Sequence, residues 1–211
     1  ARDNVGVLAE THDVISNWAG AAGVGIGGAG VGASVTVSHV GGSTRAYISG
    51  ADTEVTALAQ DQGDKLTIAE GGLQEDVNLG DGLDLELYTR PQLAELRKTE
   101  EVTGIAVAAS GTHSVENVAA NAAGGLYAGV AGTTNTTVIT GETEAYVDEA
   151  KINTTLGSEA QGLHVKASDH AYSHSFVGSV GGGLVGAGAG IDTAVFSNST
   201  RAYIRGSNPV Q

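Results

Sequence analysis

The side chains best suited to chemistry are those of six histidines, some of which stand beside serine. Neutral imidazole is a common metal ligand, and a serine–histidine pair can act as nucleophile and base. Adjacent residues of a strand point to opposite faces, so the neighbouring serines and histidines cannot form a dyad. The chain also lacks a Gly-x-Ser-x-Gly turn. The sequence therefore predicts no catalytic residue at Ser38-His39, His113-Ser114 or Ser173-His174-Ser175.

An acidic run offers oxygen ligands of the kind that calcium takes. Its candidate ligands are Asp76, Asn78, Asp81 and Asp84. The run has neither the spacing of an EF-hand loop nor a Gly-Gly-x-Gly-x-Asp repeat, and its leucines alternate with polar residues. The favoured interpretation is a plain strand with a solvated acidic face, so we expect no metal site and no cofactor.

Composition limits the partners and the compartment. The net charge of −14 argues against nucleic acid and anionic membrane surfaces, which attract clustered Lys and Arg. The apolar run at 19–37 is long enough for a membrane helix but contains seven glycines, each of which costs about 1 kcal/mol in a helix, so we expect no membrane insertion. The absence of cysteine excludes disulfides and favours an exported, extracellular protein.

Internal repetition positions these residues. Three copies of a Thr-x-Ala-Tyr-Ile/Val segment occur, each after a Gly/Ala-rich run, and each copy has a histidine that follows an upstream apolar segment. Tyr146 to Tyr203 spans 57 residues, and so does His113 to His170. Two markers that share one period indicate a repeat array. The copies are 44–48, 143–147 and 200–204, with His12, His113 and His170 upstream.

Alternation of apolar and polar residues within each copy predicts strands. Many short strands in an array predict an all-β fold, a parallel β-helix (β-solenoid) in which each repeat of 57 residues makes three stacked turns of 19. Equivalent histidines would then lie about 14 Å apart, too far to share a metal ion. We expect solenoid repeats at 1–69 and 104–211, separated by an acidic insertion at 70–103 with a helix-like run at 92–98.

The order of a Gly/Ala run, a Ser/Thr/Val strand and Thr-Arg-Ala-Tyr-Ile resembles the repeated passenger sequence of giant bacterial surface adhesins of the filamentous-haemagglutinin-like and leukotoxin type. Such passengers are exported by autotransporter or two-partner systems. The resemblance covers about two-thirds of the chain and leaves out the insertion. It implies a parallel β-helix with an adhesive or structural role at the bacterial cell surface, and it carries no catalytic residue.

Two surfaces are candidates for binding. Exposed tyrosines beside charged residues are typical of interaction sites, and a row of them could bind a host-cell or matrix receptor or a glycan. Its members are Arg45, Tyr47, Tyr146, Arg201 and Tyr203. The Gly/Ala-rich runs would stack into a smooth face, which either mediates lateral self-association or forms a tight internal corner.

Two other functions and one modification remain as alternatives. A polysaccharide-active β-helix enzyme, a lyase or glycoside hydrolase, would need a carboxylate pair that nothing in the sequence singles out. An ice-binding solenoid would need a regular Thr-x-Thr ladder, of which only 134–137 gives a hint. Asn-x-Ser/Thr sequons at Asn135, Asn153 and Asn198 either carry glycans or are turn residues.

Overall fold

The computed structural model describes residues 1, 3–58, 63–73, 97–154 and 162–206. Regular structure in these ranges consists of strands, and most of the strands are stacked in parallel sheets. The prediction of an all-β chain is confirmed. Within the same ranges there is no helix with the length and hydropathy needed to cross a bilayer.

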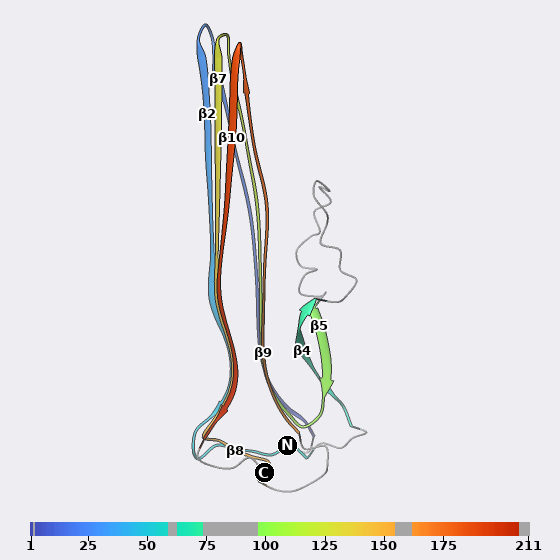
Figure 1. Cartoon of the computed structure of the whole chain (residues 1–211). Coiled ribbons are helices and arrows are strands. Elements are labelled where there is room, and N and C mark those ends of the chain that lie inside the picture. Colours follow the sequence, from blue (N-terminus) through green and yellow to red (C-terminus); the bar gives the residue numbers. More distant parts are fainter. Residues whose placement is uncertain (2, 59–62, 74–96, 155–161, 207–211) are drawn as a thin grey trace.

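Six long strands form two parallel three-stranded sheets. One sheet has the order β1 (Val5–Gly25), β6 (Ile105–Gly125), β9 (Leu163–Gly182), and the other has the order β10 (Val185–Arg205), β7 (Ala128–Asp148), β2 (Ala29–Ser49). Tight turns join β1 to β2, β6 to β7 and β9 to β10 at one shared end of the molecule (Figure 1). The sheets face each other and diverge toward the base, where both termini lie (Figure 1).

Each repeat contributes one strand to each sheet, which corrects the predicted division into three turns of 19 residues. Tyr47 pairs with Tyr146, and Tyr146 pairs with Tyr203, on directly neighbouring strands. The strands are 20 or 21 residues long, so a single passage through both sheets uses most of a repeat. At the base, β3 (Glu54–Val55) and β8 (Lys151–Ile152) add a short parallel pair.

The register of the two sheets differs by one residue. Tyr203 pairs with Tyr146 at an offset of 57 residues, but Ser168 pairs with Ser110 at an offset of 58. Consequently His12 and His170 share a row with Thr112, whereas His113 falls in the next row, between Asp13 and Ala171. A slip of one residue turns a side chain to the other face of a strand. The three histidines are therefore not equivalent, and His113 alone points between the sheets.

The space between the sheets is filled in layers. Aliphatic side chains occupy the base, including Ile105, Val107 and Val147. A smaller apolar layer, formed by Val40, Val115 and Ile139, lies nearer the turns. Beyond it, hydroxyl and amide groups bond across the gap: Ser38 Oγ donates to Asn117 Oδ1 at 2.6 Å, and Asn117 Nδ2 donates to Thr137 Oγ1 at 2.6 Å. Because polar layers lie inside, valines at 35 and 37 point outward and are exposed.

Glycine fills the last layer, where the sheets come closest. A Cβ added to Gly129 would lie 2.3 Å from the carbonyl oxygen of Gly182, and one added to Gly186 would lie 2.2 Å from that of Gly181. These inward positions therefore exclude any side chain. The tight internal corner is the correct account of the inward side of the Gly/Ala runs, while their outward side carries exposed valines at 24, 31, 130, 180 and 185.

The inserted segment begins with β4 (Leu66–Leu73) and returns through β5 (Arg97–Val102), an antiparallel pair. Ile68 and Val102 pack on Ala106 and Ala108, on the outer side of β6. Arg97 and Lys98 belong to a strand, so the helix predicted at 92–98 is wrong for these two residues. Residues 92–96 and the calcium candidates Asp76, Asn78, Asp81 and Asp84 lie outside the described residues.

Candidate functional site

The predicted tyrosines form one row on the outward side of β2, β7 and β10. The ring centroids of Tyr47 and Tyr146 are 5.1 Å apart and those of Tyr146 and Tyr203 are 5.0 Å apart, with the planes nearly parallel. Tyr47 is 50% exposed. Burial of Tyr146 between the other two rings raises the pKa of its phenol. The alternation that buries Ala46 and Ala145 leaves the tyrosines facing outward.

A row of charged residues runs beside the tyrosines, two positions earlier on each strand. Arg45 Nε donates to Glu144 Oε2 at 3.1 Å, and Arg201 Nη1 donates to Glu144 Oε1 at 3.3 Å. Arg45 also pairs with Glu142 at 2.6 Å, and this carboxylate raises the pKa of the guanidinium. Glu144 thus holds both arginines in place, with their outer faces available to solvent.

A matching ion pair closes the other side of the tyrosine row. Arg205 makes two hydrogen bonds to Asp148, at 3.0 and 2.6 Å, which lower the pKa of that carboxyl. The five predicted surface residues are therefore brought together on one face. Stacked phenol edges, with hydroxyl groups and fixed guanidinium groups beside them, can pack against a flat partner and donate hydrogen bonds to it. The sequence did not identify Glu142, Glu144, Asp148 and Arg205 as members of this surface.

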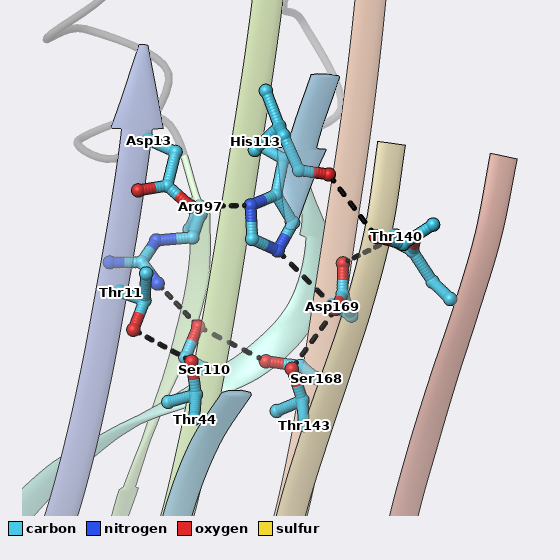
Figure 2. A network of polar contacts seen from close by, with 12 residues as sticks. Thr11, Asp13, Thr44, Arg97, Ser110, His113, Thr140, Thr143, Ser168 and Asp169 are labelled. Carbon is cyan, nitrogen blue, oxygen red and sulfur yellow. Dashed lines mark hydrogen bonds and ion pairs between the residues drawn. The ribbon is translucent and has the colours of Figure 1, made fainter. Parts of the chain in front are cut away.

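The second polar group lies between the sheets and surrounds His113, which is 2% exposed (Figure 2). Its Nδ1 is 2.9 Å from Asp13 Oδ2, and its Nε2 is 3.7 Å from Asp169 Oδ2. The hydrogen bond with Asp169 raises the pKa of His113 against the opposing effect of burial, and Asp13 adds to the rise. Imidazolium between two carboxylates is the form that these contacts favour.

Asp169 is tied to the opposite sheet as well. Thr143 Oγ1 donates to its Oδ2 at 3.0 Å, and Asn198 Nδ2 donates to its Oδ1 at 2.9 Å. Burial raises the pKa of Asp169, but the bonds from His113 and Thr143 outweigh it, so the pKa is lowered. The cluster therefore bridges three repeats and both sheets with partnered charges.

Two glycines provide the space for this cluster. A Cβ on Gly141 would lie 3.0 Å from His113 Nε2, and one on Gly111 would lie 3.2 Å from Asp169 Oδ2. Sequence reasoning singled out His113 but treated it as a surface residue, and it missed Asp13 and Asp169. The available signal was an aspartate beside the histidine in the other two copies, at Asp13 and Asp169.

The structure places the remaining chemistry apart. Within the described ranges, no group of three or more His, Asp or Glu side chains could hold a metal ion. The sequons at Asn135 and Asn198 lie within β7 and β10, which corrects their placement in turns. Asn135 is fully buried and its amide donates to Ser175 Oγ and Asp192 Oδ1, at 2.9 and 2.6 Å. Asn153 is also buried and accepts from the Ala57 amide.

Comparison of the chain with protein-family models, curated proteins and solved structures gave no match.

Proposed function

We propose that the chain is a β-solenoid segment of an exported bacterial surface protein, where it serves as an adhesive or structural stalk. Each repeat adds one strand to each sheet in parallel register, as successive coils of a solenoid do. The lack of cysteine and the net charge of −14 suit an exported protein at an extracellular surface.

The observation that carries the adhesive role is the outward row of Tyr47, Tyr146 and Tyr203 beside the Arg45–Glu144–Arg201 ion pairs. Tyrosine and arginine dominate the energetics of protein recognition, because both bring a large contact area and hydrogen-bond donors. Here stacking and ion pairing hold the side chains before any partner arrives, which reduces the entropy cost of binding. The partner class is a host-cell or matrix receptor or its glycan.

Binding of the purified segment to an array of glycans and matrix proteins tests this role. The chain with Tyr47→Ser, Tyr146→Ser and Tyr203→Ser should lose at least tenfold in affinity for whatever the unaltered chain binds. A matched control replaces the outward row of His39, Val138 and Val195, on the same three strands, and should bind normally. Equal binding by both triple variants would show that the tyrosine row is not the site. Release of reducing or unsaturated sugar ends would favour the enzyme alternative instead.

The outward valines of the Gly/Ala-rich runs support a second part of the proposal, lateral contact between copies. Val31 and Val185 are 71% and 69% exposed. Large exposed apolar surface of this kind usually marks an interaction site. Val31→Lys with Val185→Lys should lower any side-by-side association in sedimentation without unfolding the chain. A Gly186 substitution cannot serve this test, because its Cβ would collide with the facing strand.

A further inference from the structure

The two sheets are offset, so that strands of one sheet lie over the gaps of the other. β2 lies against both β1 and β6, and β7 lies against both β6 and β9. Among the described elements, β10 has extensive contact across the gap with β9 alone, and β1 likewise with β2 alone. The inward side of β10 is therefore half covered at one end of the stack, and that of β1 is half covered at the other end.

Exposure of inward apolar side chains shows the same incompleteness. Phe196 shares a row with Ile139, and Ile204 shares a row with Val147. Ile139 and Val147 are 0% and 2% exposed, whereas Phe196 and Ile204 are 50% and 52% exposed. The residue types suit a core in both repeats, but in the last repeat one wall of that core is missing. A strand that lies beyond β9, beneath β10, would supply the wall.

We propose that a second copy of the chain supplies this wall by docking head to tail. Its β1 pairs in parallel with β9, and its β2 pairs with β10, so that the register of the three repeats continues into a fourth. Val5 and Val7 of the second copy would fill the open half beneath β10, and its Ile48 and Val40 would stand beside Ile204 and Phe196. The half-covered end of β1 would at the same time receive the overhanging β10.

The tyrosine row supports the same register. Tyr203 would stack on Tyr47 of the second copy, as Tyr146 stacks on Tyr203 at 5.0 Å. Parallel strands about 4.8 Å apart would form the ladder hydrogen bonds that edge strands otherwise leave to water. The contact joins two different ends, and repetition by translation does not close into a ring, so it generates a filament. This inference is independent of whether the tyrosine row binds a receptor.

Charge opposes the contact in one row. The order Arg45–Glu144–Arg201 would place Arg201 beside Arg45 of the next copy, with no carboxylate between them. Each copy also carries a net charge of −14. We therefore expect association to strengthen as salt screens these repulsions, which distinguishes the contact from one held by ion pairs.

Disulfide trapping tests the register directly, because the chain contains no cysteine. Ser43, Glu142 and Ser199 share an outward row, so Ser199 should lie next to Ser43 of the following copy. Mixing the single variants Ser43→Cys and Ser199→Cys under mild oxidation should give a crosslinked heterodimer, since neighbouring strands place Cα atoms within the range of about 4.4–6.8 Å that a disulfide needs. Ser43→Cys mixed with Ser197→Cys, one outward position away, should crosslink several-fold less.

Sedimentation of two matched variants tests the open core. Phe196→Asp and Val195→Asp alter adjacent residues of β10 with similar exposure, 50% and 47%, but only Phe196 faces inward. Phe196→Asp should abolish concentration-dependent association with an unchanged circular dichroism spectrum, and Val195→Asp should leave association in place. A chain that stays monomeric at high salt and concentration would overturn the proposal. So would equal loss in both variants, or equal crosslinking at Ser197 and Ser199.

Discussion

At the scale of single residues, His113 shows how a change of register changes chemistry. Its sequence neighbours resemble those of His12 and His170, yet only His113 points between the sheets, toward Asp13 and Asp169. A buried charge is tolerated when it is paired and hydrogen-bonded, and here each carboxylate contacts the ring and Asp169 also accepts from Thr143 and Asn198. The cluster stabilises the fold rather than catalysing a reaction, because it is closed to solvent.

The pKa shifts of this cluster predict how stability depends on pH. The pKa of His113 is raised above 6.5 in the folded chain, so its stabilising effect is complete below about 6.5 and is lost as pH rises through the folded value. The pKa of Asp169 is lowered below 3.8, so its effect is present above about 3.8 and is lost in stronger acid. Urea unfolding should show highest stability between these limits, with a loss of about 1.4 kcal/mol per pH unit above them while His113 titrates.

The matched control for this prediction is His170, which is not in the cluster. His113→Gln should remove the loss of stability between pH 6.5 and 8. Burial lowers the pKa of His170, so that histidine contributes a change of opposite sign, and His170→Gln should leave the loss in place. A wild-type profile that is flat from pH 6 to 8 would contradict the assignment of a charged His113.

At the scale of the elements, the distance between the sheets follows the size of the inward side chains. Aliphatic residues hold the sheets apart at the base, hydroxyls and amides span the middle, and glycines let the backbones approach near the turns. The inserted pair of strands is held by an apolar contact and by ion pairs, among them Lys166 with Glu100 at 2.6 Å. Its position covers the outer side of Ala106 and Ala108 near the base.

Two glycines of β7 provide a test of this spacing. Gly129 faces the opposite sheet, and its Cβ would lie 2.3 Å from the Gly182 carbonyl oxygen, whereas Gly132 has open space around it. Gly129→Ala should destabilise the chain by about 1–3 kcal/mol, the usual cost of overpacking. Gly132→Ala should be neutral or stabilise by up to about 1 kcal/mol, because it restricts the unfolded chain without a collision. Equal effects in chemical denaturation would show that the sheets are further apart at this level.

At the scale of the whole molecule, the middle repeat is the best protected. β6 and β7 each pair with a strand on both sides, whereas β1, β2, β9 and β10 each pair on one side within the described sheets. Thr112, Val115 and Ile139 of the middle repeat are fully buried. The long sheets also make the shape elongated, with the turns at one end and the termini at the other (Figure 1).

Hydrogen exchange should reproduce this order. Amides of β6 and β7 should exchange at least tenfold more slowly than those of β10, because their opening requires separation from two neighbours. Under the high-salt, high-concentration conditions that favour end-to-end docking, protection in β10 and β2 should rise. Exchange that is uniform over all six long strands would contradict a stack with a distinct centre, and a rise confined to the turns would point to lateral contact.

The sequence by itself determined the β structure, the three copies and the outward direction of the tyrosines, because alternation with a period of two is a local property of a strand. The rest required the tertiary structure. The turn between the Gly/Ala runs has three residues in the first repeat and two in the second, and the two sheets therefore pair at offsets that differ by one residue. No local pattern reports that difference, yet it turns His113 inward and brings it to Asp13 and Asp169. Strand length, likewise, is decided by pairing with neighbouring repeats, which is why turns of 19 residues were expected and strands of 20 or 21 are found.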